Sequence, residues 1–119
     1  MFISCSNQWA VHGPLYAPFS KLCSCLSGKI YDVTVDLRQS SPTYLKWFGV
    51  WLDPKKQIFV PAGCAHGYFA AENNSILLSL HDGLSGEKRI NWRDPKLNIT
   101  WPPAKEYLIS DKDKKAEFL

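Results

Sequence analysis

The chain has 119 residues, of which 45% are hydrophobic and 13% aromatic, and its formal net charge is +3. This length predicts a single domain, residues 1–119, that buries about two-thirds of its unfolded surface. The composition excludes a disordered chain, and the small positive charge suits an anionic small ligand but not a nucleic acid. No apolar run approaches the roughly 18 residues that span a membrane. The N-terminus lacks the features of a signal peptide, so we expect a cytoplasmic protein with no membrane partner.

The sequence contains Cys5, Cys23, Cys25 and Cys64. Because no secretory signal accompanies them, we expect free thiols rather than disulfides. A zinc site would require paired Cys-x-x-Cys spacing, which the sequence lacks. We therefore predict no metal site.

Short apolar or alternating segments follow one another along the chain, separated by turns rich in Gly and Pro. They predict strands at residues 9–16, 21–26, 30–37, 47–52, 57–60, 68–71 and 75–81. Pro14 confines the first strand to a sheet edge or a bulge, and the small residues of 61–67 predict a tight loop. After Asp82 we expect a polar loop, with a short solvated helix or tail at 110–115. Many short strands at this spacing favour an all-β sandwich or barrel.

The central strand, residues 30–37, has two contrasting faces. One face carries Tyr31, Val33, Val35 and Leu37, which predicts packing against a core. The other carries Asp32, Thr34 and Asp36, and its neighbouring carboxylates repel unless they are solvated or paired. This face is therefore either the solvent-exposed side of the strand or the polar interior of a barrel that holds a ligand.

Several sequence blocks form an ordered set. They include Gly-Lys-Ile-Tyr-Asp-Val-Thr-Val-Asp-Leu-Arg at 28–38 and Gln-Ile-Phe-Val-Pro-Ala-Gly-Cys-Ala-His-Gly-Tyr at 57–68. The others are 41–44, Trp47, 91–95, 99–102 and 108–113. In order and spacing this set resembles the dTDP-4-dehydrorhamnose 3,5-epimerase family of the cupin superfamily, over residues 9–115.

The resemblance implies an all-β cupin jelly roll of antiparallel strands that forms a homodimer. Family members carry further N-terminal strands ahead of the region that matches Trp9, and this chain lacks them. We therefore expect a truncated cupin domain with an exposed edge strand.

The resemblance also implies a chemistry. The family removes protons from the carbons that flank the keto group of a dTDP-linked 4-keto-6-deoxy sugar and returns them from the opposite face, without a metal or an organic cofactor. Such a reaction needs a base, an acid on the other face and a cation for the enolate oxygen. In the family these are a histidine paired with an aspartate, a tyrosine and a lysine.

Three family catalytic positions are retained. Lys21 matches the enolate-stabilising lysine, Asp113 the dyad aspartate and Asp32 an interior carboxylate near the active site. Without the resemblance, Lys21 would be interpreted as a surface lysine and Asp113 as part of a solvated charge run.

The base and the acid are substituted. The family motif Arg-Gly-Leu-His reads His-Gly-Pro-Leu here, which places Leu15 at the base position and His12 at the phosphate-contacting arginine. On a regular strand His12 would lie on the opposite face from Leu15, roughly 10 Å away. Ser79 occupies the position of the tyrosine acid. His81 lies two residues on, where it is either a substitute acid or base or simply a histidine at a loop end.

The substrate-binding positions are better retained. By the resemblance they are His12, Lys21, His66, Glu87 and Lys112. A metal-binding cupin would need a His-x-His pair with a following Glu, and only His66 is present.

Three hypotheses follow. The chain is an epimerase-like protein of deoxysugar metabolism, either catalytically impaired or a nucleotide-sugar-binding relative. Alternatively it is an active 3,5-epimerase that uses substitute acid and base groups. A third alternative is a non-catalytic dimerisation scaffold.

Overall fold

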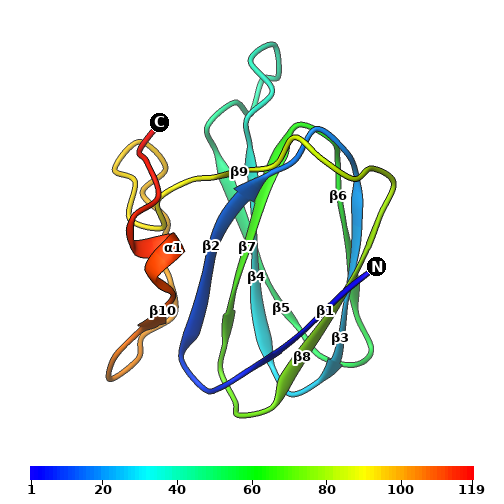
Figure 1. The fold of residues 1–119 in the computed structure, drawn as a ribbon, viewed down its shortest axis with the longest axis vertical. Coiled ribbons are helices and arrows are strands. Elements are labelled where there is room, and N and C mark those ends of the chain that lie inside the picture. Colours follow the sequence, from blue (N-terminus) through cyan, green and yellow to red (C-terminus); the bar gives the residue numbers. More distant parts are fainter.

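The computed structural model describes residues 1–119 and consists of two β-sheets packed face to face (Figure 1). The four-stranded sheet has the order β1 (Phe2–Ser6), β8 (Ser75–His81), β3 (Lys21–Ser27) and β6 (Gln57–Val60). The six-stranded sheet has the order β10 (Leu108–Ile109), β2 (Ala10–Tyr16), β7 (Cys64–Ala70), β4 (Ile30–Asp36) and β5 (Trp47–Leu52), with β9 (Lys88–Arg89) also paired to β2. All pairings are antiparallel except that of β10 with β2. The predicted all-β sandwich is confirmed.

The interior between the sheets is partly apolar and partly polar. Its apolar core consists of Cys23, Cys25, Ile30, Leu52, Val60, Cys64, Tyr68 and Leu77. Asp32 and Asp36 on β4 are buried here, so the central strand presents the polar interior of a barrel rather than a solvent-exposed side. The two carboxylates are tolerated because each has its own cationic partner, His66 for Asp32 and Arg38 for Asp36.

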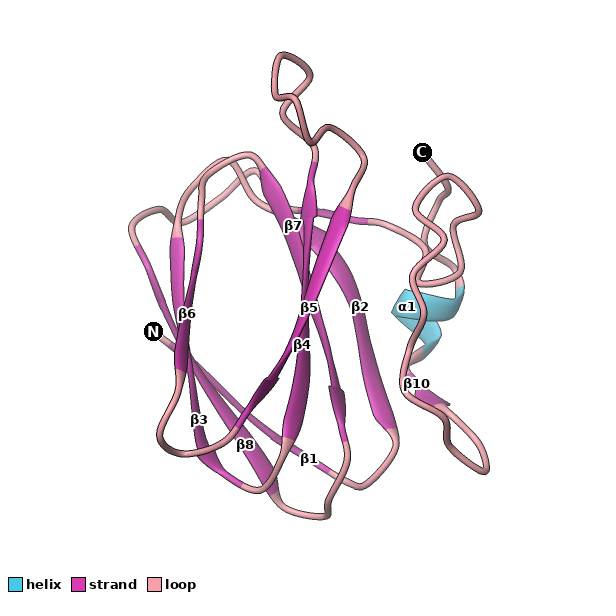
Figure 2. Cartoon of the chain, turned by 180° about the vertical axis from the view of Figure 1, so that it is seen from behind, coloured by secondary structure: helices cyan, strands magenta, loops and turns pink.

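A second core lies on the outer face of the six-stranded sheet. Figure 2 shows the C-terminal segment, with β10 and α1 (Asp111–Lys114), running beside β2 outside the sandwich. This core consists of Val11, Val33, Val35, Ala65, Phe69, Ile90, Trp92, Leu97 and Trp101. The Trp101 indole N–H donates to the Trp92 carbonyl oxygen at 3.0 Å. The segment expected to be a polar loop is thus an irregular cover held by buried aromatic side chains.

The outer face of the four-stranded sheet has no such cover. Large apolar side chains on its strands are exposed, namely Ile3, Leu26, Phe59 and Leu80. Its edges are β1 and β6, and β1 is a strand that the sequence pattern did not predict.

The predicted tight loop at 61–67 is partly wrong. The strand β7 begins at Cys64 instead of residue 68, and all seven of its residues are buried. Ala62 and Gly63 form a turn, whereas Gly67 serves strand packing, because a Cβ there would lie 2.7 Å from the carbonyl oxygen of His12 on β2. The predicted bulge is confirmed, since the β2–β7 register shifts between His12 and Leu15.

The C-terminal charged stretch forms the expected short helix. Ser110 caps α1 by accepting a hydrogen bond from the Asp113 backbone N–H. The helix is not wholly solvated, because Asp113 is only 2% exposed. The structure contains no helix that is long and apolar enough to cross a membrane.

Candidate functional site

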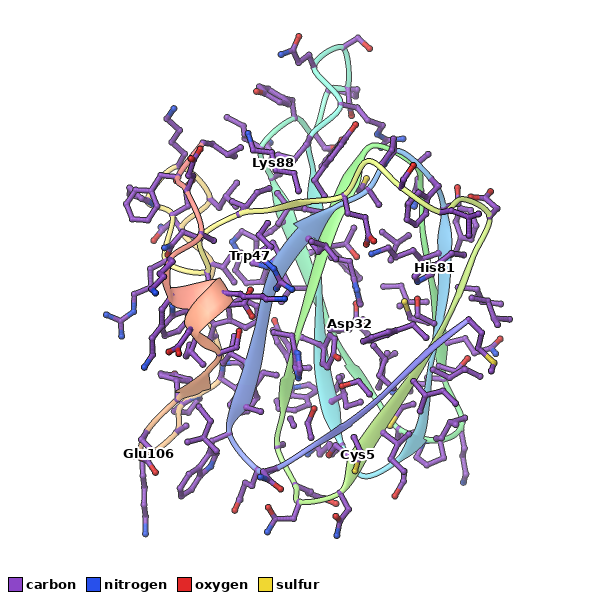
Figure 3. All side chains as sticks on the ribbon, viewed as in Figure 1. Cys5, Asp32, Trp47, His81, Lys88 and Glu106 are labelled. Atoms are coloured by element: carbon purple, nitrogen blue, oxygen red, sulfur yellow. The ribbon has the colours of Figure 1, made fainter.

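A cavity of about 290 Å³ opens between the two sheets, and all three histidines of the chain line it. One wall belongs to the six-stranded sheet and carries His12, Gly13, Leu15, His66, Tyr68 and Arg89. The facing wall carries Lys21 on β3 and Leu77, Ser79 and His81 on β8. Figure 3 shows Asp32 between the sheets and His81 on the side of the four-stranded sheet. The fold therefore brings most of the predicted site residues together.

His66 and Asp32 form a buried pair at the base of the first wall. The His66 Nε2 lies 2.7 Å from Asp32 Oδ2, and Asp32 is fully buried. Burial alone disfavours the imidazolium of His66, but the charge and the hydrogen bond of Asp32 raise its pKa to about 10. His66 is therefore a cation at neutral pH, which suits binding and positioning rather than proton abstraction.

The bulge in β2 changes the expected position of His12. Three steps along β2, from His12 to Leu15, match two steps along β7, from Tyr68 to His66. Both side chains therefore line the cavity, and the expectation that they lie on opposite faces is wrong, because it assumed a regular strand.

His12 is held on two sides. Its ring stacks on Tyr68 with the centroids 4.2 Å apart, and its Nε2 lies 2.9 Å from Ser6 Oγ. Burial lowers the pKa of His12 below its ordinary value, so the neutral imidazole predominates at neutral pH.

Asp113 is buried beside the cavity, bonded to two residues that line it, and is not part of a solvated charge run. Its Oδ2 accepts from the Gly13 backbone N–H at 3.2 Å, and its Oδ1 accepts from Arg89 Nη1 at 3.0 Å. No hydrogen bond or ion pair joins Asp113 to a histidine. Lys112, the preceding residue on α1, is exposed and does not line the cavity.

The facing wall carries Lys21 and Ser79. Lys21 is only 4% exposed, so it is not a surface lysine, and its Nζ lies 3.4 Å from Glu87 Oε2. The Ser79 hydroxyl lies 2.9 Å from His81 Nε2. Burial and then the positive charge of Lys21 lower the pKa of His81. This wall thus offers a cation, Lys21, and the neutral imidazole of His81, which is bonded to Ser79.

Among the cavity-lining residues that sequence reasoning missed, two carry polar side chains, Tyr68 and Arg89. Tyr68 lies two residues after His66 on β7, so strand alternation could have placed both on one face. Burial raises the pKa of its hydroxyl to about 12, so the phenol keeps its proton at neutral pH. Arg89 gave no local signal because β9 has only two residues.

The described side chains form no cluster of three or more potential metal ligands, and all four cysteines are free. The cavity offers hydrogen-bond donors from Lys21 and Arg89, and the neutral imidazoles of His12 and His81 on opposite walls. Such a site can bind a polar anionic ligand.

Comparisons with known proteins agree with this architecture. A family model described as dTDP-4-dehydrorhamnose 3,5-epimerase matches residues 3–119. The chain is 39% identical to the dTDP-4-dehydrorhamnose 3,5-epimerase of Shigella flexneri over 103 residues, which cover 78% of this chain and 54% of that protein. It therefore spans about half the length of the curated relatives that it matches.

Solved structures match nearly the whole chain. A dTDP-6-deoxy-D-glucose-3,5-epimerase from Legionella pneumophila in complex with dTDP-4-keto-L-rhamnose has a TM-score of 0.91 at 31% identity, covering 98% of this chain and 66% of that one. A dTDP-4-dehydrorhamnose 3,5-epimerase from Bacillus anthracis with TDP and PPi bound has a TM-score of 0.92 at 31% identity, covering 99% and 73%. These matches confirm the predicted cupin-like fold.

Proposed function

The chain belongs to the dTDP-4-dehydrorhamnose 3,5-epimerase family, and we propose that it binds a dTDP-linked 4-keto-6-deoxy sugar while epimerising it far more slowly than its relatives. The proposal has two parts, retained binding and impaired proton transfer.

Impaired proton transfer is supported above all by the residue at the position of the family's base, which is Leu15. Leu15 lines the cavity there, and a hydrocarbon side chain cannot accept a proton. The carboxylate that would orient a histidine, Asp113, is bonded to Arg89 instead. At the acid position Ser79 replaces a phenol by an aliphatic hydroxyl, which is a much weaker acid than a phenol of pKa about 10. A positioned acid or base contributes about 10²–10⁴-fold to a rate, so we infer a slow reaction.

Retained binding is supported by the other lining residues. Lys21 and His66 line the cavity and stand at positions that match the family's substrate contacts, and Asp32, the interior carboxylate, pairs with His66 from behind the wall. Lys21 is buried in the cavity wall, where it can meet the keto oxygen of a bound sugar. Glu87 holds Lys21 from the cavity rim.

A second candidate function is an active epimerase with substitute groups. The observation that favours it is that His12 and His81 line opposite walls of the cavity. Each lies on the same strand as the group that is lost, His12 with Leu15 on β2 and His81 with Ser79 on β8.

We also propose a homodimer. The support is the uncovered apolar face of the four-stranded sheet, where Ile3, Phe59 and Leu80 are exposed. Burying such side chains against a second copy would be favourable. Sedimentation analysis over a range of concentrations tests this, and a monomer at all concentrations would contradict it.

The test of the main proposal is a titration of the purified chain with dTDP-4-keto-6-deoxyglucose, followed by product analysis by NMR. The Shigella flexneri relative in the same assay is the control. We expect binding by both proteins and turnover by this chain at least about 10²-fold below the control. Turnover comparable to the control would contradict the impairment and favour the second candidate, which His12→Gln and His81→Gln variants would then test.

A further inference from the structure

Arg89 occupies an unusual position for a cationic side chain. In the pairing of β9 with β2 it lies directly opposite Leu15, the residue at the base position. It also lines the cavity, with a side chain that is 43% exposed. A charged group therefore stands beside the position where the family places its proton-transfer chemistry.

The Arg89 guanidinium is fixed in place by a buried carboxylate. Asp113 accepts from Arg89 through Oδ1, and its Oδ2 accepts from the Gly13 backbone N–H and lies 3.3 Å from the Ser110 hydroxyl. The close approach of the Asp113 carboxylate to β2 is favoured by glycine at position 13, because a Cβ there would lie 3.1 Å from Asp113 Oδ1. Asp113 is thus fully bonded and acts as a positioning residue for Arg89.

The guanidinium has unused bonding capacity. Only one of its nitrogens, Nη1, is bonded within the chain, and a guanidinium presents several N–H groups in a fixed fork that matches phosphate and carboxylate oxygens. The remaining N–H groups of Arg89, on a side chain that is 43% exposed, thus have no acceptor within the chain.

We propose that Arg89, positioned by Asp113, binds an oxyanion of the ligand, either a phosphate of the nucleotide or a carboxylate on the sugar. The inference rests on the proposed function, because it names a contact within the same cavity. It also gives that function a physical reason. The carboxylate that orients a base in the family positions an anion-binding arginine in this chain, so the wall has exchanged proton transfer for binding.

The experiment is a calorimetric titration of the full chain and its variants with four ligands: thymidine, dTDP, dTDP-glucose and dTDP-glucuronate. In the Arg89→Met variant we expect the affinity for the ligand that carries the contacted oxyanion to fall about 10- to 100-fold, with thymidine binding unchanged. A loss for dTDP identifies a phosphate, and a loss confined to dTDP-glucuronate identifies a carboxylate. The Arg89→Lys variant should lose less affinity than Arg89→Met, since lysine keeps the positive charge but lacks the planar fork of N–H groups.

The matched control is Lys88→Met, which removes the same charge from the neighbouring residue of β9, outside the cavity. We expect it to change each affinity less than about threefold. Equal losses in Lys88→Met and Arg89→Met, or undiminished binding by Arg89→Met, would overturn this inference alone. No binding of dTDP or of either dTDP-sugar by the unaltered chain would overturn both the inference and the proposed function.

Discussion

The two sheets form the two walls of one cavity, but they are supported in different ways. The six-stranded sheet is covered on its outer face by the C-terminal segment, whose Trp92, Leu97 and Trp101 are buried against it. The four-stranded sheet has no cover, and Phe59 and Leu80 on its outer face are exposed. The six-stranded sheet is thus packed on both faces, whereas the four-stranded sheet is packed only on the face that it turns to the cavity.

This difference bears on the loss of proton transfer that we propose for each wall. On the covered wall Asp113 and Arg89 come from residues far from β2 in sequence and form an ion pair, and Arg89 lies opposite Leu15. On the uncovered wall Ser79 is bonded to His81 within the same strand. Substitutions on the first wall are therefore coupled to a segment outside the sandwich, whereas both side-chain partners of Ser79, which are His81 and Cys23, lie within its own sheet.

The largest expected effect comes from restoring both walls together. The triple variant Leu15→His, Ser79→Tyr and Arg89→Ser supplies a base and a phenol, and it frees Asp113 to orient the base. We expect turnover of dTDP-4-keto-6-deoxyglucose to rise by at least about 10²-fold, measured by NMR. The double variant that keeps Arg89 is the control and should gain less, because Arg89 competes for Asp113. Equal gains by both variants would contradict the coupling on the covered wall.

The largest expected effect on stability comes from weakening the C-terminal segment that covers the six-stranded sheet. Trp101→Ala removes a buried indole and its hydrogen bond to Trp92. We expect the free energy of unfolding to fall by about 3–5 kcal/mol, measured by urea denaturation. A loss below about 1 kcal/mol would show that the C-terminal segment is not an integral layer.

The sequence predicted most of the strands because their signals are local. Alternation at 30–37 and the turn residues between strands correspond to β4 and its neighbours. The start of β7 was missed because its small residues resemble those of a tight loop. The reason for Gly67 is tertiary, because its close neighbour, the His12 carbonyl oxygen, lies some fifty residues away in sequence.

The site was predictable where it follows strand alternation or a family motif. Lys21, Asp32, His66 and Asp113 all come together near the cavity, as the ordered motifs implied. The bulge that turns His12 into the cavity, and the pairing that brings in Arg89, are tertiary events. A single Pro14 indicated a bulge but not which side chains it would turn inward.

The next effect concerns the buried pair on the covered wall. The pKa of His66 is raised in the folded chain, from an ordinary value of 6.5 to about 10. The stabilisation from its protonated form is therefore fully present below about pH 6.5 and is lost as the pH rises toward 10. We expect the free energy of unfolding to decrease over this window, as measured by urea denaturation at several pH values. Asp32→Asn removes the source of the shift, so a variant with the same pH dependence as the unaltered chain would contradict this assignment.

The smallest effect is expected on the uncovered face. The Phe59→Ser variant replaces a residue that is 60% exposed. At low protein concentration its free energy of unfolding should therefore change by no more than about 0.5 kcal/mol. The measurement is urea denaturation at two concentrations. A stability loss above about 2 kcal/mol at the lower concentration would show that this face is buried in the folded chain, and the contrast between the two sheets would fail.

The most direct test of the central claim, that the cavity binds the nucleotide sugar but transfers protons poorly, is deuterium incorporation from heavy water. The chain is incubated with dTDP-4-keto-6-deoxyglucose at a concentration that saturates binding, and the sugar is analysed by mass spectrometry. We predict incorporation at the two carbons that flank the keto group at least about 10²-fold slower than with the Shigella flexneri relative. Incorporation at both carbons at a rate similar to that relative would contradict the account and would point to His12 and His81 as working acid and base groups.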